Sequence, residues 1–110
     1  MIEVGCLVTI TKDGACFLDA VKVSLLDEIK QNGSLSGAAK KLKISYQHAW
    51  TLIADMNRVA PQPLVEKQRG GANGGGAAIT SYGEKILGDY RLIEAQVKKM
   101  ISQINVEINL

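Results

Sequence analysis

The sequence predicts a mainly α-helical fold, and three observations support this prediction. Apolar residues recur at intervals of three and four over much of residues 20–59 and again after residue 81. Segments rich in glycine, serine or proline divide these stretches into separate helices. Two short apolar stretches flank an Asp-Gly pair, and two more flank a glycine-rich run, which predicts two β-hairpins. This order predicts a winged helix-turn-helix over residues 1–80, followed by a long dimerisation helix over residues 81–110.

The composition is typical of one globular unit of 110 residues, with 46% hydrophobic and 22% charged residues. The net charge of +2 is compatible with a nucleic-acid partner but is not specific for one. No apolar run approaches the ~18 residues of a membrane span, and the first residues lack the features of a signal peptide. We therefore expect a cytoplasmic protein without membrane contacts. Cys6 and Cys16 are expected to be buried, reduced thiols.

The first elements are a hairpin and a helix. Residues 5–18 alternate in period two around Asp13-Gly14, a pair whose members both tolerate positive φ and which therefore favours a tight hairpin turn. Residues 20–32 then switch to helical spacing, and Gly33 can end that helix in the left-handed conformation. The apolar face of this helix is expected to comprise Val21, Leu25, Leu26 and Ile29.

Residues 33–57 carry the strongest functional signal. Ser34 or Ser36 can cap one helix, and after a tight turn Ser45 can cap a second helix that runs to about Val59. The expected buried positions are Leu35, Ala38, Ala39 and Leu42 in the first helix, and Ala49, Leu52, Ile53 and Met56 in the second. The opposite side of the second helix then presents Tyr46, Gln47, His48, Trp50 and Thr51. Polar groups in that first turn are what a helix-turn-helix places in the major groove of DNA.

Two residues of this group have alternative interpretations. Trp50 is either a partly buried core residue or a DNA contact. His48 is the only histidine and has no partner for catalysis or metal binding, so we expect no catalytic site, no metal site and no cofactor. A helical hairpin that packs without binding DNA remains the structural alternative for the whole motif.

The second hairpin is predicted from strands over 64–68 and 77–80. The run between them holds five of the eleven glycines, but no Lys-Ser/Thr pair follows it, so it is not a nucleotide-binding P-loop. It is either a plain loop or a wing that lies on the DNA backbone. The wing interpretation assigns phosphate contacts to Lys67, Arg69, Gly71 and Asn73. Lys40, Lys41 and Lys43 can add contacts from the helix-turn-helix, or they form a solvated basic face.

The last helix is capped by Thr80 or Ser81 and is expected to extend over about 28 residues, or ~42 Å. Its apolar positions alternate in steps of four and three: Ile86, Tyr90, Ile93, Val97, Met100 and Ile104. Such spacing is typical of a coiled-coil interface. The stripe is therefore interpreted as a homodimer interface, with packing inside one chain as the alternative.

Several motifs together resemble the N-terminal domain of ModE-type molybdate-responsive transcription regulators, which is related to the LysR-type winged helix. These motifs are Ser45-Tyr46 with Ala49-Trp50, the glycine-rich wing, and Thr80 with Gly83, and the resemblance extends over about residues 5–105. It implies a dimer joined through the first hairpin and the last helix. It also implies molybdate sensing by a separate C-terminal region, so we do not expect molybdate to bind residues 1–110. Lys43 stands where such turns often carry glycine.

The sequence thus predicts a homodimeric regulator that binds double-stranded DNA at a palindromic operator and is not an enzyme. Ser45 would cap the recognition helix, and a two-fold pair of such helices would contact half-sites about one helical turn apart. The alternative is a protein-interaction module that dimerises with a larger regulator, with DNA binding secondary.

Overall fold

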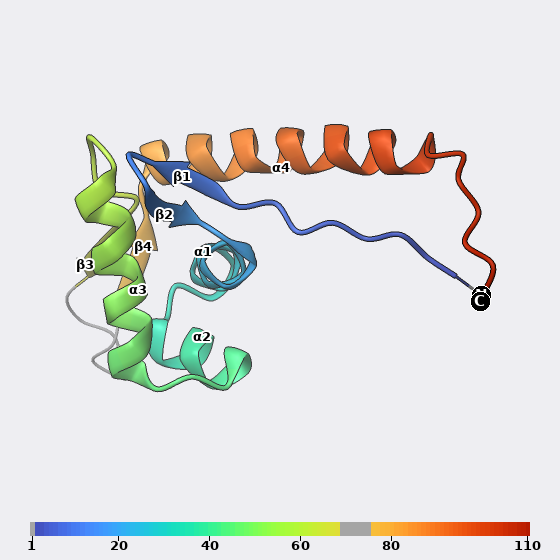
Figure 1. The fold of residues 1–110 in the computed structure, drawn as a ribbon. Coiled ribbons are helices and arrows are strands. Elements are labelled where there is room, and N and C mark those ends of the chain that lie inside the picture. The colour runs from blue at the N-terminus through green and yellow to red at the C-terminus, as the bar shows by residue number, and fades with distance from the viewer. Residues whose placement is uncertain (1, 69–75) are drawn as a thin grey trace.

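The computed structural model describes residues 2–68 and 76–110, and within them the predicted order of helices and hairpins is confirmed (Figure 1). The elements are β1 (Ile10–Lys12), β2 (Ala15–Leu18), α1 (Ala20–Asn32), α2 (Leu35–Leu42), α3 (Tyr46–Val59), β3 (Val65–Gln68), β4 (Gly76–Ile79) and α4 (Ser81–Ser102). The architecture is mainly helical and is that of a winged helix-turn-helix.

The core lies between α1, α2, α3, β2 and the first turns of α4. Its fully buried residues include Leu25, Leu35, Ile53, Met56 and Leu64. One predicted core position is wrong, because Val21 is 48% exposed. Lys22 and Val23 are buried instead. The Lys22 stem can be buried because its Nζ donates a hydrogen bond of 2.9 Å to the Cys16 carbonyl.

The first hairpin forms at the predicted turn. Asp13 and Gly14 both have positive φ, 51° and 81°, as an Asp-Gly turn of this type requires. The paired strands are shorter than the sequence pattern suggested, because β1 begins only at Ile10. Residues 2–9, which we call the arm, form no strand and run alongside α4 (Figure 1). The expectation of two buried thiols is wrong for Cys6, which is exposed on the arm.

The second hairpin is attached to the turn between α1 and α2. β3 and β4 pair antiparallel with Val65 opposite Ile79. An isolated bridge joins Ser34 to Gly76, and the Ala77 N–H donates to the Gly33 carbonyl at 3.4 Å. The hairpin is thus fixed both to the core and to the start of the helix-turn-helix.

The predicted caps at the starts of α2, α3 and α4 and at the end of α1 are confirmed. Ser34, Ser45 and Thr80 each accept a hydrogen bond from a backbone N–H in the first turn of α2, α3 and α4. Gly33 ends α1 with φ of 62°, and Lys43 ends α2 with φ of 59°. Lys43 therefore adopts the left-handed conformation that a glycine would adopt at lower cost.

Helix α4 is shorter than predicted, with 22 residues, and the expectation of about 28 is wrong. After Ser102 the chain continues as residues 103–110, which we call the tail, without regular structure. The first turns of α4 pack on the core through Gly83, Leu87 and Tyr90, and the remaining turns project from it (Figure 1). None of the helices in the described ranges has the length and apolarity to cross a membrane.

Candidate nucleic-acid interface

The first turn of α3 forms an exposed polar surface. Ser45 accepts a hydrogen bond of 3.0 Å from the His48 N–H, which fixes where the helix begins. Ala49 is fully buried, whereas Tyr46, Gln47 and His48 are all exposed. The predicted orientation of the helix is therefore confirmed, and its amide, imidazole and phenol groups can donate and accept hydrogen bonds in solvent.

Trp50 is partly buried, as the first of its two interpretations predicted. Its side chain packs against the core. The Tyr46 ring meets it edge to face, with 6.3 Å between ring centroids and 81° between planes. The Lys67 Nζ lies 4.7 Å from the Trp50 ring centroid, within cation–π distance. Trp50 therefore connects α3 to the wing strand β3.

Two hydroxyl groups of α3 already have partners inside the helix. The Ser45 hydroxyl accepts the capping hydrogen bond, and the Thr51 hydroxyl donates one of 3.1 Å to the Gln47 carbonyl. Each oxygen retains further hydrogen-bonding capacity, because a hydroxyl group both donates and accepts. Gln47 and His48 make no side-chain hydrogen bond within residues 2–68 and 76–110, so their polar groups are the more available ones.

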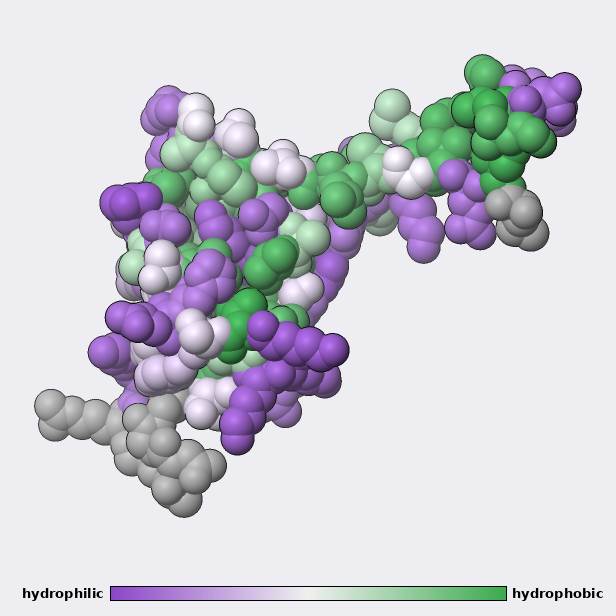
Figure 2. Space-filling model, turned by 60° about the horizontal axis from the view of Figure 1, so that its bottom comes forward, coloured by the Kyte–Doolittle hydropathy of each residue, from purple (hydrophilic) through white to green (hydrophobic). Residues whose placement is uncertain are grey.

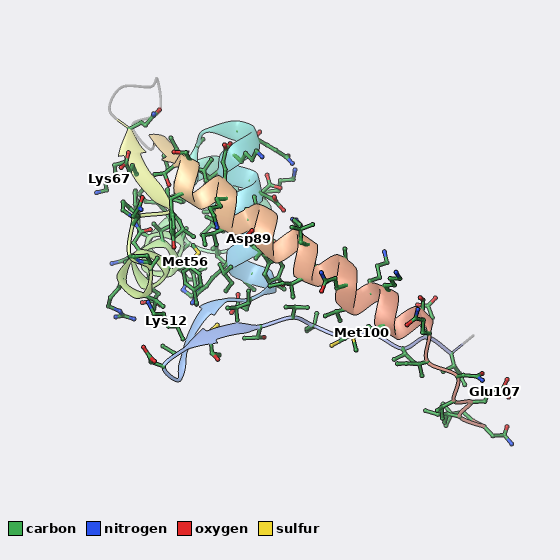
Figure 3. All side chains as sticks on the ribbon, turned by 90° about the horizontal axis from the view of Figure 1, so that it is seen from above. Lys12, Met56, Lys67, Asp89, Met100 and Glu107 are labelled. Atoms are coloured by element: carbon green, nitrogen blue, oxygen red, sulfur yellow. The ribbon has the colours of Figure 1, made fainter. Side chains whose placement is uncertain are left out.

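Basic side chains surround this surface. Lys40 and Lys43 are exposed at the end of α2 and in the turn, and Lys67 projects from β3 at the edge of the molecule (Figure 3). Among the described residues, no carboxylate lies within 4.0 Å of these three ammonium groups, whereas Lys41 pairs with Glu28 at 3.3 Å. The three unpaired ammonium groups give the surface a positive charge.

Two side chains, Asn57 and Thr80, fix the start of the second hairpin by hydrogen bonds to its backbone. The sequence pattern did not predict these hydrogen bonds. The Asn57 amide accepts a hydrogen bond of 2.8 Å from the Leu64 N–H and donates one of 3.1 Å to the Val65 carbonyl. Thr80 caps α4 and also donates to the Pro63 carbonyl at 2.7 Å. The signals for Asn57 were its polar side chain one turn before a Pro-x-Pro segment and the Met56-Asn57 pair within the family resemblance.

Gly83 permits the close approach of α4 to this hairpin. A Cβ atom there would lie 2.3 Å from the Leu64 carbonyl oxygen and 2.8 Å from Ile79 Cγ1. The predicted wing contacts Arg69, Gly71 and Asn73 lie outside the described residues. Lys67 is the one member of that predicted group within them, and it lies beside Trp50.

The predicted dimer stripe divides into two parts. Tyr90 is 2% exposed, and its hydroxyl donates a hydrogen bond of 2.9 Å to the Val8 carbonyl, so its assignment to an exposed interface is wrong. Ile86 also packs against the core of its own chain. Ile104 lies beyond the end of α4 and therefore has no helical register with the others. Ile93 and Met100 remain exposed, and Val97 is partly exposed.

The surface has the chemistry of a binding site. Within the described ranges, no group of three or more His, Cys, Asp or Glu side chains could hold a metal ion. The exposed side chains of α3 are hydrogen-bonding groups, and those of Lys40, Lys43 and Lys67 are cationic. Such a combination can contact base edges and phosphates.

Comparison with known proteins gives a consistent result. No family model matches the chain. The transcriptional regulator ModE of Haemophilus influenzae is 48% identical over 88 residues, which is 80% of this chain and 34% of that protein. The DNA-binding transcriptional dual regulator ModE of Escherichia coli is 40% identical over 93 residues, which is 84% of this chain and 35% of that protein.

A molybdenum transport protein ModE of Azotobacter vinelandii is 37% identical over 92 residues, with 34% of its length covered. The chain thus spans about a third of the length of these curated relatives, and the match is consistent with their N-terminal part. Transcriptional regulators of this kind are not enzymes. The chain is a homologue of ModE-type transcription regulators over about a third of their length, a match that is consistent with an N-terminal DNA-binding domain.

Proposed function

We propose that the chain binds double-stranded DNA in a sequence-specific manner and acts as a transcription regulator in the cytoplasm. The observation that carries this proposal is the contact of Trp50 with Tyr46 and Lys67. It holds the wing strand beside the exposed first turn of α3, so a helix and a cationic strand can engage one duplex together. The similarity to the DNA-binding regulator of Escherichia coli supports the same function.

The surface suggests a division of roles. Gln47 and His48 would reach base edges in the major groove, because their side chains are exposed and otherwise unpaired among the described residues. Lys40, Lys43 and Lys67 would contact phosphates and fix the position of the protein on the duplex. Arg69, Gly71 and Asn73 remain predicted contacts of the wing.

The same proposal includes a homodimer at a palindromic operator. Ile93 and Met100 are exposed on the projecting part of α4, where their own chain does not cover them. A second copy would cover them and would place two α3 helices on one duplex. Two-fold symmetry of the protein would then match half-sites spaced by about one helical turn, as in other dimeric helix-turn-helix proteins.

The proposal can be tested by selecting binding sites from a pool of random duplexes with the purified chain. The selected duplex is then titrated with the Gln47→Ala variant and with the Gln31→Ala variant, a control that makes the same exchange on the exposed side of α1. Loss of a base contact is expected to weaken binding by about 5- to 150-fold, or roughly 1–3 kcal/mol, while the control binds as the parent does. Equal binding by both variants would reject α3 as the recognition helix.

One observation favours a second function. The exposed apolar residues on α4 would also suit a larger regulator as partner, with DNA binding secondary. Retention on immobilised duplex DNA at about 0.15 M salt separates the two functions. A chain that passes through unretained would favour the interaction module, whereas elution only at higher salt would favour the regulator.

A further inference from the structure

The side of α3 that faces away from the core carries a row of four exposed residues. Ala49, Ile53 and Met56 are the buried residues of this helix and define its core side. At 3.6 residues per turn, four positions lie opposite these three. All four are exposed, and we call them the outward row: Gln47, Thr51, Ala54 and Arg58.

The edge of α3 between the core side and the outward row lies against β3. Trp50 contacts the Lys67 ammonium group on this edge. One helical stretch further on, Asn57 forms hydrogen bonds with the backbone of Leu64 and Val65. The outward row therefore lies beside β3 and remains open to a duplex that would contact both elements.

The Thr51 hydroxyl is turned back against its own helix. It donates a hydrogen bond of 3.1 Å to the Gln47 carbonyl, so its one proton is already used. The Cβ atom of a threonine carries only a hydroxyl and a methyl group. The methyl group of Thr51 is therefore the branch that remains for a contact outside the helix.

Ala54 follows Thr51 in the outward row and offers a methyl group alone. The two residues are three positions apart, which is ~4.5 Å along the helix axis. Successive base pairs of DNA are ~3.4 Å apart, a similar spacing. The two methyl groups therefore suit neighbouring base pairs.

The next residue of the row ends this uncharged stretch. Arg58 pairs with Asp55 at 3.2 Å, so its charge is directed at a carboxylate of the same helix. The main apolar region of the surface lies elsewhere, because hydrophobic side chains gather on the projecting end of the molecule, away from α3 (Figures 1 and 2). Apolar contacts made by the outward row would therefore involve single methyl groups and not an extended patch.

The major groove of unmodified DNA presents one apolar group, the C5-methyl group of thymine. Methyl groups of threonine and alanine are among the side-chain groups that contact it. We propose that Thr51 and Ala54 are specificity-determining residues that select thymine at adjacent base pairs through this methyl group. The inference rests on the proposed function, in which α3 lies in the major groove. It gives Ala54 a role and assigns the contact of Thr51 to its methyl group.

Replacement of thymine by uracil tests the inference, because uracil lacks only the C5-methyl group. In the duplex selected from the random pool, each thymine is replaced in turn, and the affinity of the full chain is measured at one salt concentration. We define the uracil penalty as the ratio of the two affinities. At the contacted positions we expect a penalty of about 3- to 10-fold, because burial of one methyl group is lost.

Substitutions in the protein connect each penalty to one side chain. Thr51→Ser and Ala54→Gly each remove one methyl group, so each should abolish the penalty at one position and leave the other. Thr51→Val keeps a methyl group and removes the hydroxyl, so it should retain both penalties. Ala20→Gly makes the alanine exchange at an exposed position of α1 and is the control. Each penalty is a ratio within one variant, so changes in the stability of the fold largely cancel.

The outcomes separate this inference from the function on which it rests. If the pool yields no enriched sequence, sequence-specific binding fails and the inference fails with it. If a sequence is enriched and Gln47→Ala weakens binding to it, absent penalties would overturn only the inference. Penalties that persist in both Thr51→Ser and Ala54→Gly would also overturn it, because they would then arise from the duplex itself. Loss of a penalty in Thr51→Val would overturn the role of the Thr51 methyl group.

Discussion

The Lys67 ammonium group lies over the Trp50 ring, with Nζ 4.7 Å from the ring centroid. This contact joins β3 to α3. Trp50 in turn rests on the core and is met edge to face by Tyr46. The position of β3 relative to α3 thus involves this contact as well as the hydrogen bonds of Asn57.

Lys67→Met keeps the aliphatic stem and removes the charge. We expect weaker binding to all duplexes alike and a shallower dependence of affinity on salt, by about one unit of slope, because one phosphate contact is lost. The emission of Trp50, the only tryptophan, should also change. Lys85→Met on α4 is the control and should leave both quantities unaltered. A loss confined to the selected sequence would show that Lys67 contacts bases.

Gly83 and Gly88 make a matched pair in α4. Gly83→Ala is expected to lower the free energy of unfolding by about 1–3 kcal/mol or more, because the added Cβ would meet the Leu64 carbonyl at 2.3 Å. A Cβ atom at Gly88 would meet no atom within 4 Å, so Gly88→Ala should raise the free energy of unfolding by about 0.5–1 kcal/mol through helix propensity. Urea unfolding of both variants measures the difference, and equal effects would refute the close approach at Gly83.

The buried phenol of Tyr90 leads us to expect that the folded protein loses stability at alkaline pH. Burial, with the nearby carboxylates Glu94 and Asp19, raises the pKa of the Tyr90 phenol above its usual value of 10.0. The folded state therefore favours the neutral phenol, so this contribution is complete below about pH 10 and is lost as pH rises through the raised pKa.

At pH 7 the Tyr90→Phe variant should have a free energy of unfolding about 0.5–1.5 kcal/mol lower than that of the parent chain, because the hydrogen bond to the Val8 carbonyl is lost. Above pH 10 the difference between the two chains should shrink, and unfolding curves collected across this range measure it. A difference that stays constant with pH would contradict the raised pKa.

The backbone conformation of Lys43 affects the stability of the fold, whereas its charge is proposed to affect DNA binding. Its φ of 59° is strained for a lysine, whereas glycine would relieve the strain but add freedom to the unfolded chain. These effects oppose each other, so Lys43→Gly should change the free energy of unfolding by less than about 1 kcal/mol. The same variant should still weaken DNA binding and flatten its salt dependence, because a phosphate contact is lost. Unchanged binding would remove Lys43 from the interface.

The sequence was sufficient where local chemistry determines the structure. Ser45 and Thr80 cap helices because their hydroxyl groups satisfy unpaired N–H groups, and Asp13-Gly14 forms its turn because both residues accept positive φ. Ala49 faces the core, and Gln47, about half a turn away on the helix, faces outward, as helical spacing predicts. These local rules were enough to predict the fold and the exposed face of α3.

Relationships between distant segments could not be predicted in this way. The burial of Tyr90 depends on the Val8 carbonyl, 82 positions earlier, and the stripe pattern cannot distinguish such a contact from a partner chain. The Lys67–Trp50 contact and the hydrogen bonds of Asn57 likewise depend on where β3 lies against α3. Helix α4 ends at Ser102 because the spacing changes from helical to alternating, a change that the apolar stripe through Ile104 obscured.

The most direct test of the central claim is amide hydrogen exchange of the full chain with and without a selected duplex. The proposed interface predicts that DNA slows the exchange of backbone amide hydrogens in residues 45–51 and 65–68. This slowing is expected even though the helix and the strand already exist in the free chain. The projecting part of α4 should exchange equally in both samples once dimer concentration is matched. Slowing confined to α4 or the arm, with α3 and β3 unaffected, would contradict DNA binding through this surface.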